Sequence, residues 1–134
     1  MRKPFCIKLL AALLLAVVMA GSAGAAYNLN FTLYNRSGWF FRRIWLSPSG
    51  NKQWNPNRDV VSHGRTDTTL SSGNSTRITF DNVSQERRNV ATWDLRIDGS
   101  DGKKHEFHNI PLSQIMGVEI GRGWQISYIW PGDI

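Results

Sequence analysis

The residues best suited to chemistry lie between Asp98 and His108, where two histidines and several acids follow one another. Neutral imidazoles are common zinc ligands. His105 and His108 are three residues apart, however, and side chains at that spacing on a strand point to opposite faces. The run Asp98–Gly102 resembles a calcium loop but lacks the downstream glutamate of an EF-hand. We therefore expect a turn at Asp98–Gly102 and no metal ion or cofactor.

Covalent catalysis has little support in the residues that remain. The single cysteine, Cys6, lies close to the N-terminus, and no G-x-S-x-G motif is present. Most acids lie in expected turns or beside arginine and lysine, which lowers a carboxyl pKa rather than raising it. Sequence does not show the distance between carboxylates, so a hydrolytic pair stays open as the minor alternative. The sequence predicts no catalytic residue and a protein that is not an enzyme.

Tryptophan is the stronger signal, with 6 in the chain. Most of these rings should lie in the core, because aromatic side chains bury large areas. Trp39 and Trp54 are left over, since they flank turns and have no clear place on an alternating face. We take them as candidate binding residues, together with Arg58 and Arg65, because tryptophan and arginine are enriched at binding hot spots.

The stretch Ser47–Gly73 has no useful periodicity and contains Trp54, Arg58 and Arg65. Structureless loops longer than about 12–15 residues are uncommon in compact domains and are usually functional or disordered. We expect this long loop to present those three residues to a partner. The structural alternative is that Trp54 packs against the edge of the core.

The rest of the chain consists of short alternating segments separated by turn residues. Apolar and polar side chains that alternate indicate half-buried strands, and many short strands indicate a sandwich or small barrel. We predict an all-β, antiparallel β-sandwich of about seven strands with one long loop. The expected strands lie at residues 27–35, 39–46, 76–80, 90–98, 103–110, 118–120 and 124–130.

Two of these segments carry specific expectations. Trp93, Leu95 and Ile97 alternate with polar residues and should form the centre of the core. In the segment 39–46, strict alternation puts Phe40, Ile44 and Leu46 on one face. It puts Phe41 and Trp45 on the other face. Arg42 and Arg43 then fall one on each face, so one of them must extend its charge to solvent or find a partner.

The first 25 residues have the charged, apolar and small-residue order of a secretory signal peptide, with Ala23–Ala25 as an A-x-A cleavage site. The apolar run is shorter than the roughly 20 residues of a membrane span, so an uncleaved anchor is the weaker alternative. The remainder, residues 26–134, should be one β-sandwich domain. We expect a periplasmic or secreted protein whose mature form does not span a membrane.

Removal of this segment changes the charge balance. Three of the 16 basic residues and none of the 10 acids lie in it, which leaves a net charge of +3. That excess is too small to indicate nucleic-acid binding.

The sequence resembles a family of small exported bacterial β-sandwich domains of unassigned function. The likeness lies in Leu46–Gly50 with Trp54 downstream, then Leu70–Ser75, Trp93–Arg96 and Asp101–Gly102. It implies no catalytic residue. Some similar chains are called argininosuccinate lyases, but such lyases are large, helical and cytoplasmic, whereas this chain is short, exported and strand-rich.

One departure from the pattern bears on stability. Similar chains often place a cysteine shortly before the Trp-Asp pair and another after the next strand, where this sequence has Ala91-Thr92 and Leu112-Ser113. A disulfide implied by the resemblance is therefore missing here.

We expect an exported, non-catalytic binding module that recognises another envelope or secreted protein, as an inhibitor or immunity-type partner. The alternative is a carbohydrate-binding module for cell-wall or anionic glycan that uses exposed tryptophan and arginine.

Overall fold

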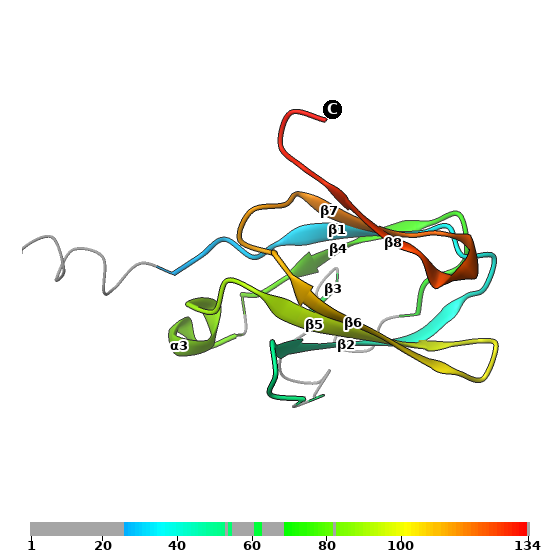
Figure 1. The fold of residues 1–134 in the computed structure, drawn as a ribbon, viewed down its shortest axis with the longest axis horizontal. Helices are drawn as coiled ribbons and strands as arrows, with labels where there is room; N and C mark the ends of the chain where they lie inside the picture. The colour runs from blue at the N-terminus through cyan, green and yellow to red at the C-terminus, as the bar shows by residue number, and fades with distance from the viewer. Residues whose placement is uncertain (1–25, 53, 55–60, 63–68, 82, 134) are drawn as a thin grey trace, which may run out of the picture.

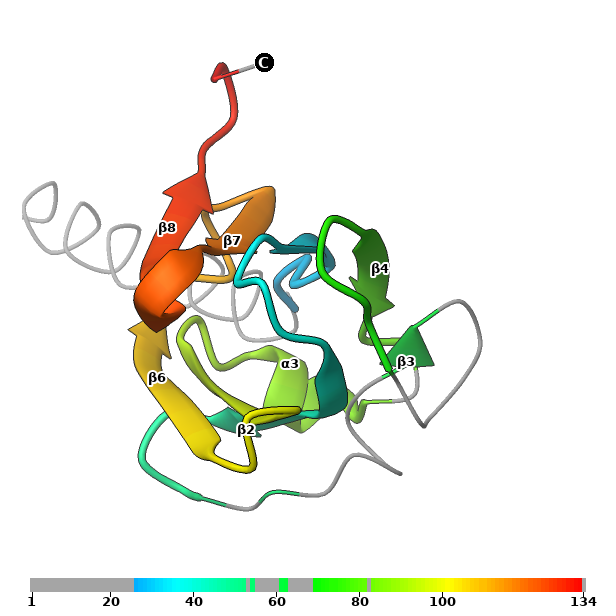
Figure 2. The same cartoon turned by 90° about the vertical axis from the view of Figure 1, so that its right-hand side faces the viewer.

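The structure, a computed structural model, describes residues 26–52, 54, 61–62, 69–81 and 83–133. The predicted signal peptide at residues 1–25 lies outside the described residues, as do Arg58 and Arg65. In the described part of the chain, no helix has the length and apolar character needed to cross a membrane. Two β-sheets face each other across a single core (Figures 1 and 2), so the predicted all-β sandwich is confirmed.

Sheet A has five strands in the order β3-β4-β1-β7-β8, and sheet B has three in the order β2-β5-β6. The seven segments expected from the sequence all contain strands, and β3 is a short addition within the long loop. The bounds are β1 Phe31–Asn35, β2 Phe41–Pro48, β3 Val61–Ser62, β4 Ser75–Thr79, β5 Trp93–Gly99, β6 Lys104–Ile110, β7 Gly117–Ile120 and β8 Ile126–Ile129, with the short helix α3 Gln85–Arg88 and the 3₁₀ turn η1 Arg122–Trp124.

One strand pair departs from the antiparallel expectation. β1 pairs with β7 in parallel, with Leu33 opposite Val118, whereas the other described pairs are antiparallel. Parallel neighbours need a long crossover. Here the whole of sheet B lies in the sequence between β1 and β7, so the crossover is the other layer of the sandwich.

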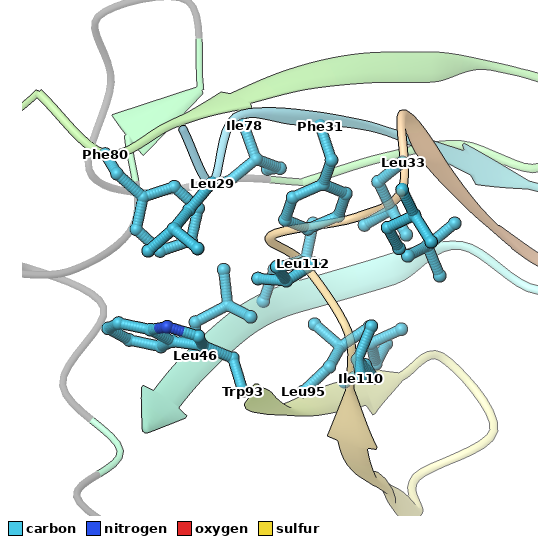
Figure 3. Close-up of a cluster of buried hydrophobic side chains, with 14 of the residues drawn as sticks. Leu29, Phe31, Leu33, Leu46, Ile78, Phe80, Trp93, Leu95, Ile110 and Leu112 are labelled. Atoms are coloured by element: carbon cyan, nitrogen blue, oxygen red, sulfur yellow. The ribbon is translucent and has the colours of Figure 1, made fainter. Parts of the chain in front are cut away.

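The core lies between the inner faces of the two sheets (Figure 3). Trp93, Leu95 and Ile97 are fully buried, as predicted. The Trp93 ring meets Phe80 edge to face at 5.1 Å between centroids, and its Nε1–H donates to the Val90 carbonyl at 2.8 Å. Its one polar atom is therefore satisfied inside the core.

A β-bulge in β2 overturns the expected faces of this strand. Phe41 pairs with Gly99 while Arg43 pairs with Asp98, so β2 holds one extra residue at this point. Phe41 is consequently buried with Ile44, and Phe40 is exposed. The assignment of Phe40 to the inner face and Phe41 to the outer face was wrong, because strict alternation does not survive a bulge. Arg42 and Arg43 both point to solvent for the same reason.

The expectation that most tryptophans lie in the core was also wrong. Only Trp93 is fully buried, whereas Trp39 and Trp130 are exposed. Trp45, Trp54 and Trp124 are half-buried. A small two-layer sandwich has few positions on its inner faces, and most are filled by leucine, isoleucine and phenylalanine. The remaining indole rings are therefore available for surface roles.

The predicted turn between β5 and β6 is confirmed. Gly99 N–H donates to the Lys103 carbonyl at 3.0 Å, and Asp101 Oδ1 accepts from Lys103 N–H at 3.0 Å. Gly102 has φ +80°, a conformation in which a Cβ is strained. The aspartates and glycines that suggested a calcium loop therefore have a structural role in the turn.

Truncating Trp93 should remove the largest buried side chain from the core. We expect Trp93→Ala to lower the free energy of unfolding by about 3–5 kcal/mol, because the lost burial and the new cavity add. Urea denaturation followed by circular dichroism measures this. Trp39→Ala is the matched control and should shift stability by no more than about 0.5 kcal/mol, since Trp39 lies at the surface. Equal midpoints for the two variants would contradict the assigned core.

Candidate functional site

Three turns gather at one end of the sandwich, on the right of Figure 1. They are residues 36–40 between β1 and β2, residues 100–103 between β5 and β6, and residues 121–125 between β7 and β8. We call this surface the turn end. Loops that a rigid scaffold holds in place are frequent sites of binding. The turn end includes Trp39, the one predicted site residue that is fully described and exposed.

The first turn is organised by the side chain of Asn35, which is completely buried. Its Nδ2 donates to the carbonyls of Trp39 at 2.8 Å and Leu70 at 2.9 Å. Its Oδ1 accepts from Ser37 N–H at 3.1 Å and Ser37 Oγ at 2.8 Å. All four hydrogen-bonding positions of the amide are thus used. A buried amide satisfied in this way fixes the backbone around it.

Trp39 and Phe40 are held from both sides by further hydrogen bonds. Trp39 N–H donates to Ser37 Oγ at 3.1 Å, and Phe40 N–H donates to Ser100 Oγ at 3.0 Å. Ser100 N–H donates back to the Phe40 carbonyl at 2.9 Å. The turn between β1 and β2 is therefore tied to the β5–β6 turn, which belongs to sheet B.

On this fixed backbone, two large aromatic side chains point outward. Trp39 is 46% exposed and Phe40 is 44% exposed. The Arg42 guanidinium lies over the Phe40 ring, 5.7 Å from its centroid. Adjacent large apolar side chains on an ordered turn are unusual at a free surface, where patches of this kind often mark binding sites.

Trp124, in the turn between β7 and β8, packs on the β5–β6 hairpin. Its ring stacks on His105 with centroids 3.5 Å apart and on Phe41 at 5.6 Å. Its backbone has φ +58°, which is strained for a bulky residue. A Cβ on Gly99 would come within 2.8 Å of the Trp124 ring, so only glycine fits there. Stacking of Trp124 on β6 thus joins sheet A to sheet B and offsets the backbone strain.

Charges at the turn end are mostly positive. Arg36 pairs with Glu119 at 2.8 Å, and His105 Nε2 lies 2.9 Å from Asp101 Oδ2. Burial acts to raise the pKa of Asp101, but hydrogen bonds from the Lys103 amide and His105 outweigh it, so that this pKa is lowered.

Three further cations lie in or beside these turns: Arg42, Lys103 and Arg122. None of the three has an ion pair with another residue that the structure describes. The acids at this end already have partners, so these three charges leave it electropositive.

Of the other three predicted site residues, the structure describes only Trp54. Trp54 is half-buried, and most of the residues around it in the sequence lie outside the described part of the chain. Arg58 and Arg65 also lie outside it. The prediction that these three residues form a recognition loop stays untested. Sequence reasoning missed Phe40, because alternation placed it in the core, and the bulge that exposes it has no clear sequence signal.

The two histidines of the β5–β6 hairpin have different carboxylate partners. His105 contacts Asp101, whereas His108 Nδ1 lies 3.3 Å from Asp94 Oδ2. In the part of the chain that is described, no three histidine, cysteine or acidic residues are grouped so that they could hold a metal ion.

Asp94 is the one buried carboxylate among the described residues, and it acts as a structural hub. Its oxygens accept from Asn109 N–H at 2.9 Å and Gly50 N–H at 3.1 Å, as well as from His108. Burial alone would raise the pKa of Asp94, but these hydrogen bonds outweigh it and lower the pKa below its ordinary value of 3.8. Asp94 thereby ties the start of the long loop to β6.

No family model and no curated protein matches the chain. Among solved structures, it is similar to a protein from Eubacterium rectale whose structure was determined by NMR. The two sequences are 18% identical over 82% of this chain and 93% of that chain, with a TM-score of 0.45.

The lowered pKa of Asp94 makes stability depend on pH in a defined direction. The ionised carboxylate stabilises the fold above the unfolded-state pKa, near 3.8, and this contribution is lost as the pH falls toward the lower folded-state pKa. We expect Asp94→Asn to lower the free energy of unfolding at pH 7 by about 1.5–3 kcal/mol. The difference in the free energy of unfolding between the wild type and Asp94→Asn should become smaller below about pH 4.

Urea titrations at pH 7, 5 and 3 measure this effect. Asp81→Asn, at an exposed aspartate, is the control, and its free energy of unfolding should stay close to that of the wild type at each of these pH values. A difference for Asp94→Asn that stays constant from pH 7 to pH 3 would contradict the assigned role of the carboxylate.

Proposed function

We propose that this chain is an exported, non-catalytic binding module that recognises another protein of the envelope or the extracellular medium through its turn end. The observation that carries the proposal is the adjacent pair Trp39 and Phe40, exposed on a backbone that is fixed by hydrogen bonds. Aromatic residues are enriched among those that dominate binding energy at protein interfaces.

The physical argument combines apolar area with pre-organisation. Burial of exposed apolar surface contributes roughly 25 cal/mol per Å², so two large rings form a strong anchor for a complementary recess. Ordering of a flexible loop on binding opposes association. The hydrogen bonds of Asn35 and Ser100 have already ordered this turn in the free protein. Most of the burial energy of Trp39 and Phe40 is therefore available for affinity.

The positive charges of the turn end indicate what kind of protein surface the partner presents. Arg42 lies over the Phe40 ring, and Lys103 and Arg122 belong to the other two turns of this end. These charges favour a recess rimmed by acidic side chains. Complementary charges of this kind raise the association rate and make it sensitive to salt. Arg42 is particularly suited to a carboxylate, because its planar guanidinium forms two parallel hydrogen bonds. An inhibitor or immunity-type complex with an acidic protein surface fits these features best.

The long loop stays a second proposed recognition element. Trp54, Arg58 and Arg65 have residue types that suit a binding hot spot. Its described start, at Ser49 and Gly50, bends toward Asp94 on sheet B rather than toward the turn end. Its described end, at Leu70 and Ser72, hydrogen-bonds to the turn between β1 and β2.

Replacing both exposed rings should abolish recognition without unfolding the protein. We expect the Trp39→Ala, Phe40→Ala double variant to keep its melting temperature within a few degrees and to bind its partner at least 30-fold more weakly. This loss corresponds to hot-spot energies of about 2 kcal/mol or more. The partner is first captured from a periplasmic extract on the immobilised mature chain, and its affinity for each variant is then measured by biolayer interferometry.

The matched control is Trp130→Ala, because Trp130 is a comparably exposed indole, at 40%, and lies outside the turn end. This control should keep wild-type affinity. Unchanged affinity of the double variant, or equal losses in the double variant and the control, would overturn recognition through the turn end.

The Arg58→Ala, Arg65→Ala double variant tests the loop separately. A recognition loop predicts an intact fold and binding weakened by roughly 1–2 kcal/mol for each arginine. Retained affinity in a folded variant would exclude these arginines from the interface. The companion change Trp54→Ala distinguishes the structural alternative, since a ring packed on the core edge would lose stability rather than affinity.

A further inference from the structure

The outer face of sheet B carries a second organised set of side chains, which does not overlap the aromatic pair. The strand registers place Trp45, Arg96 and Glu106 in one row across β2, β5 and β6. We call this surface the polar face. Its members are Arg43, Trp45, Asp94, Arg96, Asp98, Lys104, Glu106 and His108.

The centre of the polar face is a closed network of three residues. Trp45 Nε1–H donates to Asp98 Oδ2 at 3.0 Å, and Arg96 Nε–H donates to Asp98 Oδ1 at 3.1 Å. The Arg96 guanidinium lies over the Trp45 ring, 5.1 Å from its centroid. Both oxygens of Asp98 are therefore occupied, and the two planar groups are held in fixed positions on the three-stranded sheet.

The residues around this network keep hydrogen-bonding capacity toward solvent. Glu106 lies opposite Arg96 across β5 and β6, but the two form no ion pair within 4.0 Å. Its exposed carboxylate has no hydrogen-bond partner among the described residues. His108 is 48% exposed, and its Nδ1 faces Asp94. The exposed part of the His108 ring is therefore available to a ligand.

Charge on this face is balanced, in contrast to the turn end. The three cations Arg43, Arg96 and Lys104 are balanced by the three acids Asp94, Asp98 and Glu106, of which Asp94 is buried. A balanced set of fixed donors and acceptors offers no net attraction to a polyanion or polycation. It does match a ligand that carries many hydroxyl groups and no charge, because each hydroxyl can both donate and accept.

We propose that the polar face binds a neutral oligosaccharide, with Glu106 and His108 hydrogen-bonding to its hydroxyl groups and the stacked, planar Trp45–Arg96 pair forming a contact for the sugar rings. Neighbouring strands lie about 4.8 Å apart, close to the length of one pyranose unit, so successive rings can meet successive strands. The site differs in its residues from the alternative drawn from the sequence, which was a module for cell-wall or anionic glycan. It is also independent of protein recognition at the turn end.

The test is binding of chitohexaose and cellohexaose, two neutral hexasaccharides, to the ¹⁵N-labelled mature chain, with hexagalacturonate as the anionic comparison. We expect at least one neutral hexasaccharide to shift the amide resonances of β5 and β6, and not those of residues 36–40. Affinity should change less than twofold between 50 and 500 mM NaCl, because screening acts on charged pairs. Hexagalacturonate should bind at least tenfold more weakly.

Glu106→Ala should weaken binding at least tenfold and leave the fold intact, because the carboxylate is exposed and has no described partner. Arg77→Ala is the matched control: Arg77 lies on the outer face of sheet A, where it reaches Thr32 Oγ1 at 3.3 Å. This variant, and the Trp39→Ala, Phe40→Ala double variant, should bind as wild type does.

Three results would overturn the proposal: no shift with either neutral hexasaccharide at 5 mM, shifts confined to another surface, or unchanged affinity in Glu106→Ala. None of the three bears on protein recognition by the turn end.

Discussion

The chain passes from sheet A to sheet B within the five residues between β1 and β2, and the buried amide of Asn35 organises the hydrogen bonds at that crossing. The Trp39 carbonyl accepts from the side chains of Asn35 and Ser37, and the Leu70 carbonyl accepts from Asn35 and from Phe41 N–H. An unpaired buried carbonyl would cost about 1–3 kcal/mol. Asn35 donates to both and accepts from Ser37 in return. The crossing can be short because this side chain, together with the backbone bridge between Phe41 and Leu70, satisfies the polar groups of the turn. Trp39 and Phe40 follow on a backbone with little freedom, and both rings are directed outward.

The same crossing explains how the two proposed surfaces become separate. Phe41 enters the core directly after the turn, and the bulge behind it places Arg42 and Arg43 together on the outside. Arg42 then stacks on Phe40 at the turn end, whereas Arg43 joins the balanced charges of sheet B. One inserted residue thus divides the outward side chains of β2 between an electropositive, aromatic end and a neutral, polar face.

The architecture could be predicted from the sequence because it follows from the alternation of apolar and polar residues within each strand. Trp93, Leu95 and Ile97 alternate with polar residues, and a half-buried strand demands that pattern. The site could be predicted only in part. Trp39 stood out because it has no place on an alternating face. Phe40 was missed because a bulge depends on pairing with β5, which is a long-range contact. The prediction that most tryptophans are buried was wrong because the inner area of the two sheets is limited. Which rings fit there depends on the whole fold and not on the neighbouring sequence.

Pre-organisation of the aromatic pair is the central claim, and ¹⁵N relaxation of the free mature chain tests it most directly. The account predicts backbone order parameters near 0.85 at Trp39 and Phe40, equal to those of the adjoining strands. Asn35→Ala should lower them, while the core strand β5 stays ordered. Order parameters below about 0.6 at Trp39 and Phe40 in the wild-type chain would mean a flexible turn. That result would contradict the account, because the rings would then be presented without the fixed backbone on which their proposed role depends.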